Sequence, residues 1–454
     1  MKKIRLAPIH MIPGSFLLAI LAGTLLLKLP WASASGRSTD FVTALFTATT
    51  SVCVTGLVVV DTYAHWSTFG QIVILLLIQI GGLGIITVAS MMMLMLRKKF
   101  TLSDRTLLQD ALNVDSSSGL LKLLRRIVIG TFLVEGMGTV LYSFAFVREY
   151  GFGKGIWASA FTAVSAFCNA GIDILGPDSL VRYRADSYVL GVTMLLIILG
   201  GLGYVVWFDI ASNAKHASEY GHSLRQRFKR LREHTKVVLC LTVGLIIIGA
   251  ILFLITEYHN PATIQDMNLK DKILNSLFES VTLRTAGFAT IPQQNLNGAS
   301  SMIAYFLMFI GGSPIGTAGG VKTVTMFLVI LNALSYVRGK SVTTVFNRKI
   351  SNELMRKAAA IVQISFMAMI VLTVLLVLTN PVTLEDGLFE IISALATVGL
   401  TRGVTPGLNT VGRLIVIAAM YLGRIGPISM AVFFMKQKGN KPRLEYVEGR
   451  FHVG

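Results

Sequence analysis

TSVCVTGL, residues 50–57, lies in the first quarter of this 454-residue chain and returns in related form three times. The related segments are AFCNAGI around Gly171, TLRTAGF around Gly287 and ALATVGL around Gly399. A phenylalanine precedes each of the four glycines by nine or ten residues, and successive glycines are 112 to 116 residues apart. One such segment arises by chance in many proteins. Four copies at near-constant spacing indicate a fourfold internal repeat.

The composition is that of a membrane protein. Hydrophobic residues make up 53% of the chain, charged residues make up 14%, and the mean hydropathy is +0.68. Soluble domains carry about 25% charged residues, so much of this surface is expected to meet the lipid bilayer. The net charge of +18 comes from short basic runs between long apolar stretches, which argues against a nucleic-acid partner. The three cysteines have no paired spacing, so neither disulfides nor a cysteine metal site is predicted.

The N-terminus resembles a secretory signal peptide, because MKKIR precedes an apolar run and the small-residue stretch WASAS. Cleavage would remove the first helix of the first repeat while the other three repeats stay complete. We therefore expect this segment to be retained as a membrane helix.

Each repeat reads as a membrane helix, a shorter apolar helix, the glycine segment and a second membrane helix. About 20 helical residues cross the hydrocarbon core of roughly 30 Å, whereas a ten-residue helix can only enter and return. The predicted fold is an all-α polytopic membrane protein, with eight transmembrane helices and four re-entrant pore loops around a central pore. We expect second helices that continue to about residue 96 in the first repeat and residue 211 in the second. The predicted repeats are 1–97, 98–214, 215–338 with a broken second helix, and 339–454 with a C-terminal tail.

Most Lys and Arg residues lie near the termini and in the loops 97–126, 215–236 and 338–357. Basic residues favour the cytoplasmic side of a membrane, so both termini and these loops are predicted to be cytoplasmic, in the inner (cytoplasmic) membrane. The short helices then enter from outside. Acidic residues near them, such as Asp40, Asp61 and Glu385, could concentrate cations at an outer mouth, although most acids in loops are simply solvated.

Irregular backbone inside a membrane is tolerated only where protein buries it or where it lines a water-filled path. Four such segments around one axis offer rings of carbonyl oxygens that can replace the hydration shell of a monovalent cation. The short helices point the negative ends of their dipoles toward the same centre. Glycine suits the segments because it reaches backbone conformations that other residues rarely adopt. The repeats therefore predict a cation pore.

The chain resembles the superfamily of K+ transporters that contains Ktr, Trk and HKT proteins, and it is most like the KtrB-type membrane subunit of bacterial Ktr systems. The resemblance covers the four glycine segments, GGLG at 81–84 and 200–203, GGSPIGTAGGVK at 311–322 and YLGRIGP at 421–427. The first repeat begins within a dozen residues of Met1, without the two additional N-terminal helices of Trk subunits, which favours the Ktr type. The terminal GRFHVG is similar to the tail at the Ktr dimer contact.

The resemblance implies K+ uptake, with Na+ coupling left open, no organic cofactor in this chain, a homodimer, and control by a cytosolic KtrA-like nucleotide-binding ring. Backbone carbonyls would hold K+ as the metal ion. Carried over by position, the selectivity filter consists of Val54, Thr55, Gly56, Asn169, Ala170, Gly171, Thr285, Ala286, Gly287, Thr397, Val398 and Gly399. Because the four segments share only the glycine, we expect weaker discrimination between K+ and Na+ than in a symmetric channel.

A gate is predicted in the third repeat. A helix over residues 300–337 would measure roughly 57 Å, nearly twice the hydrocarbon thickness, so it must break. The glycines and the proline near its middle weaken the helix there. By resemblance this segment is the intramembrane gate, and Arg424 lies at a matching depth, where its charge could repel cations and its N–H groups could hold loop carbonyls. The predicted gate residues are Gly311, Gly312, Ser313, Pro314, Ile315, Gly316, Thr317, Ala318, Gly319, Gly320, Lys322 and Arg424.

Other interpretations fit less well. A secondary transporter of another class is expected to show inverted or twofold repeats, whereas these four run in one orientation. An intramembrane enzyme needs a nucleophile, an acid–base pair or metal ligands within its spans, and the sequence shows only scattered charges such as Glu135. A buried structural pair is the simpler role for Glu135. The GGLG pairs are interpreted as sites of close helix packing. A Trk-type or Na+-permeable transporter of the same superfamily stays an alternative.

Overall fold

The structure is a computed structural model that describes residues 8–84, 87, 90, 120–220, 223–340 and 342–426. The first basic cluster, most of the loop 97–126 and the C-terminal tail with GRFHVG lie outside the described residues, as does Pro427 of YLGRIGP. The predicted continuation of the first repeat's second helix to residue 96 also falls largely outside them.

One order of elements returns four times along the described chain: a first helix, a short helix, an irregular segment and a second helix. The first helices are α1 (Pro8–Leu27), α7 (Leu120–Tyr150), α12 (Glu233–Glu257) and α16 (Asn352–Thr379). The short helices are α2 (Phe41–Cys53), α8 (Phe152–Cys168), α13 (Leu269–Thr282) and α17 (Leu384–Leu395). The second helices are α4 (Thr68–Leu83), α9 (Ser187–Leu202), α14 (Gly298–Phe309) and α18 (Thr410–Ile425).

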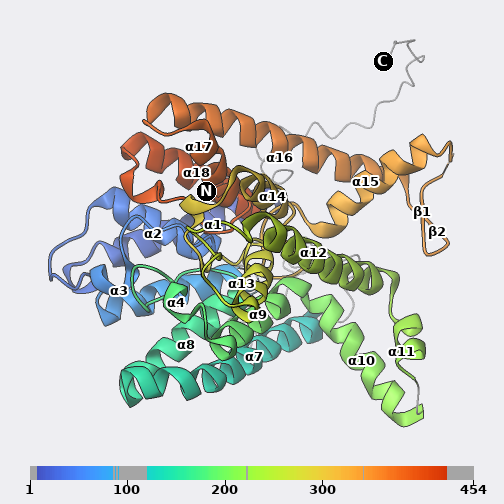
Figure 1. Ribbon diagram of the computed structural model, residues 1–454, viewed down its shortest axis with the longest axis horizontal. Coiled ribbons are helices and arrows are strands. Elements are labelled where there is room, and N and C mark those ends of the chain that lie inside the picture. The colour runs from blue at the N-terminus through green and yellow to red at the C-terminus, as the bar shows by residue number, and fades with distance from the viewer. Residues whose placement is uncertain are drawn as a thin grey trace, which may run out of the picture.

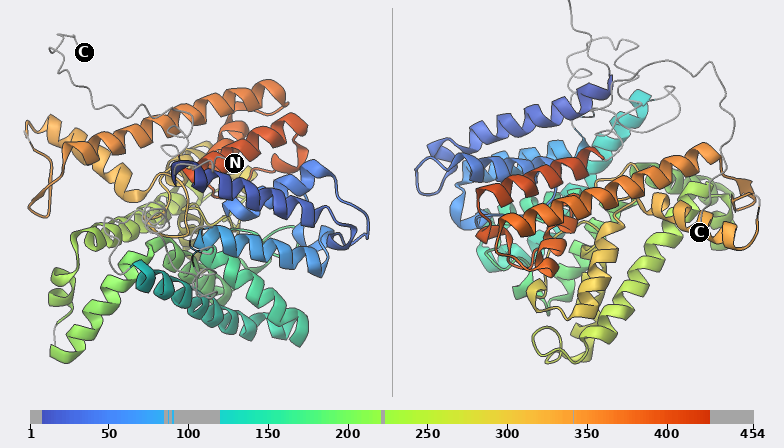
Figure 2. Two further views of the ribbon diagram at one scale, coloured as in Figure 1. Left: turned by 180° about the vertical axis from the view of Figure 1, so that it is seen from behind. Right: turned by 90° about the horizontal axis from the view of Figure 1, so that it is seen from above.

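Smaller elements connect these groups. Two further helices, α10 (Tyr204–Tyr220) and α15 (Thr323–Val337), continue the second and third groups. The remaining elements are α3 (Thr62–His65), α11 (Leu224–Arg230), the strands β1 (Thr344–Val345) and β2 (Arg348–Lys349), and four 3-10 turns, Pro30–Ala32, Val181–Tyr183, Gln293–Asn295 and Thr405–Gly407. Helices α10, α11 and α15 and the β1–β2 hairpin project from the same side of the molecule (Figures 1 and 2).

Polar side chains fix where the second helices begin. Ser67, Asp186, Asn297 and Asn409 each precede such a helix and accept a hydrogen bond from a backbone N–H in its first turn, at 2.8 to 3.3 Å. The first N–H groups of a helix have no partner within it, and these caps satisfy one of them in each case. The four second helices therefore start in the same way.

Three first helices are long and apolar enough to cross a membrane within the described residues, by length and composition: Lys122–Tyr150, Glu233–Glu257 and Asn352–Thr379. The pair α9 and α10 adds a fourth, bent candidate. The structure also contains shorter apolar helices, among them Phe41–Cys53 and Thr68–Leu83. The chain thus has the all-α architecture of a polytopic membrane protein.

The four groups close into a ring. Each short helix packs against the second helix of the preceding group: α8 against α4, α13 against α9, α17 against α14, and α2 against α18. The last of these contacts joins the fourth group to the first. Figure 1 shows the irregular segments gathered between the groups. The glycine segments, spread over more than 340 residues, are therefore brought to one central place.

The second helix of the second group, expected to continue to about residue 211, consists of two parts, α9 and α10. It bends by 97° between α9 and α10. Gly203 lies at the bend with φ 88° and ψ 140°, and Gly84 and Gly426 end α4 and α18 in nearly the same conformation. A positive φ is readily reached by glycine alone, which explains why these helices stop where they do.

Candidate functional site

The four glycine segments share an unusual backbone conformation. The first residue of each lies in the left-handed region: Val54, Asn169, Thr285 and Thr397, with φ between 52° and 72°. The glycine two residues later also has a positive φ, between 62° and 101°, whereas the residue between them does not. Alternating conformations of this kind turn successive carbonyls toward one side of the chain. Each segment can therefore present several oxygen atoms to one ligand.

The four glycines also lie against one another. A Cβ built on Gly56, Gly171 or Gly287 would lie 2.5 to 2.7 Å from a carbonyl oxygen of the next segment in chain order. A Cβ on Gly399 would meet the carbonyl oxygen of the first segment, which closes the circle. The oxygens belong to Ala170, Ala286, Val398 and Thr55, respectively. The four glycines and these four carbonyls thus form one closed circle of backbone contacts, in which no larger residue fits at the glycine positions.

The side chains beside the glycines are enclosed by protein. Those of Thr55, Ala170, Ala286 and Val398 are fully buried. The site therefore offers backbone oxygens for binding, which is the chemistry that suits a dehydrated alkali cation.

Hydroxyl groups hold three of the segments in place. Thr50 and Ser393 accept hydrogen bonds from the amides of Gly56 and Gly399, at 3.0 and 3.1 Å. Ser165 accepts one from the amide of Ile172 at 3.1 Å. All three hydroxyls lie six residues before the glycine, a spacing that is visible in the sequence and that our sequence interpretation missed. The third segment differs, because Thr282 donates to the carbonyl of Phe288 at 2.6 Å instead.

An irregular loop separates α14 from α15. It runs from Ile310 to Lys322 and contains all of the predicted gate residues except Arg424. A short parallel bridge pairs Ile310 with Val321 and brings the two ends of the loop together. The loop is buried at Gly311, Gly312, Ser313, Thr317, Ala318 and Gly319.

The loop docks on the bend between α9 and α10. The amides of Ser313 and Thr317 donate to the carbonyls of Gly201 and Gly200, at 3.0 and 3.2 Å. In return, the amide of Tyr204 donates to the carbonyl of Ile315 at 2.9 Å. The bend frees backbone groups that a continuous helix would use internally. The second GGLG motif therefore receives the loop, a role that the sequence did not reveal.

The same loop reaches the glycine segments. Thr317 donates through its hydroxyl to the carbonyl of Phe167 at 3.0 Å, and the side-chain amide of Asn169 donates to that hydroxyl at 3.3 Å. The amide of Gly319 donates to the hydroxyl of Thr285 at 3.2 Å. Any movement of the loop must therefore break contacts with the second and third segments.

Arg424 joins the loop to the first group. Its guanidinium donates to the carbonyl of Thr317 at 2.7 Å and to that of Gly81 at 2.6 Å. Within the described ranges Arg424 makes no ion pair, so its interactions are with backbone carbonyls. Lys322 turns back on its own loop and donates to the carbonyls of Ala318 and Gly319, at 2.6 and 3.5 Å. Two cations thus hold carbonyl oxygens of the loop.

Charges near the expected outer mouth have local roles. Asp40 and Asp61 cap α2 and α3. Glu385 and Asp386 both form ion pairs of 2.8 Å with Arg402, whose single positive charge offsets part of their combined negative charge. Deeper in the protein, Glu135 is buried, and its carboxyl group accepts a hydrogen bond from the thiol of Cys168 at 3.7 Å.

Comparisons with known proteins agree with this architecture. Residues 15–442 match the model of the TrkH family, described as a cation transport protein. The chain is 40% identical to the potassium/sodium uptake protein NtpJ of Enterococcus hirae over 97% of this chain and 96% of that protein. It is 36% identical to the Ktr system potassium uptake protein B of Bacillus subtilis over 100% of this chain and 98% of that protein.

A solved structure shows the same fold. The crystal structure of the potassium transporter TrkH from Vibrio parahaemolyticus superposes with a TM-score of 0.71, at 15% identity, over 96% of this chain and 86% of that one. The family model covers most of the chain, and full-length relatives exceed 30% identity. The chain therefore belongs to the TrkH family of cation transport proteins and is a potassium or cation uptake transporter of the Ktr/Trk type.

Proposed function

We propose that the ring of glycine segments is a selectivity filter through which this chain takes up K+. The observation that supports it is the closed circle of contacts between the four glycines and the carbonyl oxygens of Ala170, Ala286, Val398 and Thr55. The K+ ions would be held by carbonyl oxygens of the twelve filter residues. We further propose that each of the four groups is one repeat, with the boundaries predicted from the sequence.

The loop between α14 and α15 is proposed as the gate. It lies directly against filter residues Asn169 and Thr285, and Arg424 holds one of its carbonyls. Hydrogen bonds to charged groups contribute about 1.5 to 3 kcal/mol each, so this contact favours the closed position. A cytosolic ring would open the path by drawing the loop away.

The partner is proposed to be a KtrA-like nucleotide-binding ring, and the membrane subunit to be a homodimer. The support comes from relatives named as parts of Ktr systems, and from the projecting elements α11 and β2, which carry Arg225, Arg227, Lys229, Arg230, Arg348 and Lys349. By the charge distribution these elements face the cytoplasm, as do both termini. Part of the same charge would bind anionic lipids.

Sodium transport is the second candidate. The relative from Enterococcus hirae is named a potassium/sodium uptake protein, and the four filter segments here differ in every position except glycine. An irregular filter would discriminate less between the two cations. Measurement of K+ flux and of Na+ flux in the same vesicles decides between K+ uptake and Na+ transport.

The decisive experiment is growth at low K+ of a bacterium that lacks its own uptake systems, with the chain expressed alone and together with a KtrA-like ring. We expect growth to be restored, most strongly with the ring present. Purified protein in liposomes should then take up K+ in preference to Na+. Membrane expression without rescue and without flux would overturn the proposal.

A further inference from the structure

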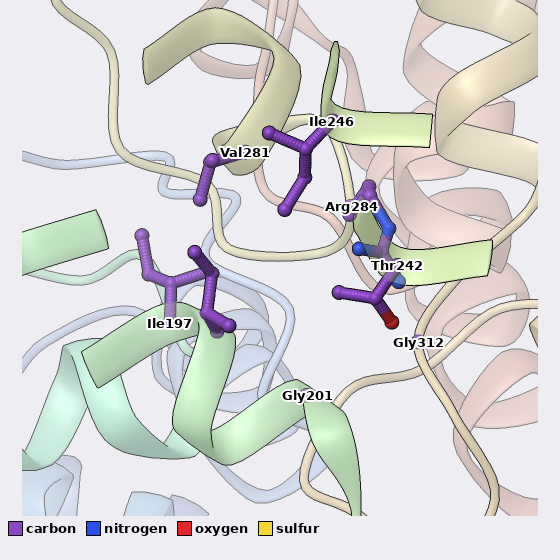
Figure 3. Close-up of a pocket in the computed structure, with 8 residues that line it drawn as sticks. Ile197, Gly201, Thr242, Ile246, Val281, Arg284 and Gly312 are labelled. Atoms are coloured by element: carbon purple, nitrogen blue, oxygen red, sulfur yellow. The ribbon is translucent and has the colours of Figure 1, made fainter. Parts of the chain in front are cut away.

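A small cavity lies beside the third glycine segment, between α9, α12, the end of α13 and the loop at Gly312. Its walls are mostly apolar and include Ile197, Ile246 and Val281. Two polar side chains, Thr242 and Arg284, line the same space. Figure 3 shows the Arg284 guanidinium directed toward Thr242 at one end of the cavity, with Ile197 at the other.

Both polar groups are buried and have no hydrogen-bond partner among the described residues. Arg284 is 7% exposed, and in the described part of the chain its guanidinium makes neither a hydrogen bond nor an ion pair; its Nε is sealed from solvent. Thr242 is 5% exposed, and its hydroxyl likewise has no partner among the described residues. The sequence places this arginine three residues before Gly287, where the other three segments carry Cys53, Cys168 and Ala396.

An unpaired guanidinium in such a place needs compensation. Arginine stays protonated in proteins, so it cannot lose its charge by releasing a proton. Burial of an uncompensated charge costs several kcal/mol. The cavity supplies only donors from Arg284, a hydroxyl from Thr242 and an apolar wall. These lining groups suit a small, weakly hydrated anion. A cation would be repelled by the guanidinium, and a phosphate group needs more hydrogen-bond donors and more room.

We propose that this cavity binds one inorganic anion of the size of chloride, held by Arg284 and Thr242. The bound anion neutralises the positive charge next to filter residue Thr285 and beside Gly312 of the loop. It thereby stabilises the packing of α9, α12 and the loop around the cavity. The inference concerns an anion and does not require that the glycine ring conduct K+.

The test measures thermal unfolding of the full chain in lipid nanodiscs, at constant K+, with gluconate replaced stepwise by chloride or bromide. We expect the unfolding temperature to rise with halide and to saturate, because a ligand that binds only the folded protein stabilises it. Arg284→Gln should abolish the rise, and Thr242→Val should move its midpoint to severalfold higher halide. Thr373→Val is the matched control, since its hydroxyl on α16 is also buried without a partner but lies outside the cavity.

A structure with bromide adds an independent readout, with anomalous density expected between Arg284 and Thr242. Absence of any halide dependence in the wild type, an unchanged response in Arg284→Gln, or density for only a water or an acyl chain in the cavity would each overturn the proposal. If Arg284→Gln does not fold, Thr242→Val and the bromide density still decide. If the protein shows no K+ flux but keeps this halide response, the proposed filter is contradicted and the proposed anion site is not.

Discussion

Arg424→Ala tests the proposed gate most directly. The side chain donates two hydrogen bonds, to the carbonyls of Thr317 and Gly81, and only the first of these holds the loop. Loss of one charge-assisted bond of about 1.5 to 3 kcal/mol shifts a closed–open equilibrium by about 10- to 150-fold. We expect K+ flux without the cytosolic ring to rise toward the flux of the fully activated protein, and its dependence on the ring and nucleotide to decrease.

The assay is uptake of K+ or a tracer ion into liposomes, with and without the ring. Arg413→Ala is the matched control, because Arg413 lies on the same helix and donates instead to the carbonyl of Leu408 at 3.0 Å. Arg424→Lys keeps the charge but lacks the forked geometry that reaches two carbonyls, so an intermediate flux is expected. Unchanged or lower flux from folded Arg424→Ala protein would refute the proposed gate.

Three further substitutions address the filter and the bend. Gly56→Ser should lower the ratio of K+ to Na+ flux, because the new Cβ collides with the facing carbonyl and the backbone has φ 101°. Ser393→Ala leaves the amide of Gly399 without its hydroxyl acceptor, at a cost of about 1 to 3 kcal/mol, and should also lower that ratio. Gly203→Ala introduces strain of about 1 to 3 kcal/mol at φ 88° and should lower the thermal stability while loosening the docked loop.

Matched controls separate these effects from general damage. Gly36→Ser places a side chain at a similar positive φ but in open space, so its flux ratio should equal that of the wild type. Ser393→Thr keeps the hydroxyl and should keep the selectivity. Gly191→Ala lies inside α9 with nothing near the new Cβ, and it should stabilise rather than destabilise. A flux ratio in Gly56→Ser equal to that of the wild type would remove Gly56 from the filter.

The sequence by itself determined the class of the protein. Its apolar composition requires a membrane, and the fourfold return of the glycine segment predicts four similar groups, because covalent spacing and hydropathy are properties of the chain alone. The concentration of glycine and proline at 311–320 likewise predicts an interruption, since these residues weaken a helix wherever they occur. These local properties can be predicted from the sequence without knowledge of the tertiary contacts.

Only the tertiary structure decided what these segments touch. The sequence does not show that a Cβ on Gly56 would meet Ala170 or that Thr317 hydrogen-bonds to Arg424, because these pairs lie more than 100 residues apart and meet only when the ring closes. It gives no sign of the 97° bend at Gly203, since GGLG fits close helix packing equally well. The sequence likewise does not show that the Arg284 guanidinium is buried without a partner among the described residues, because burial and side-chain contacts arise only when the chain folds.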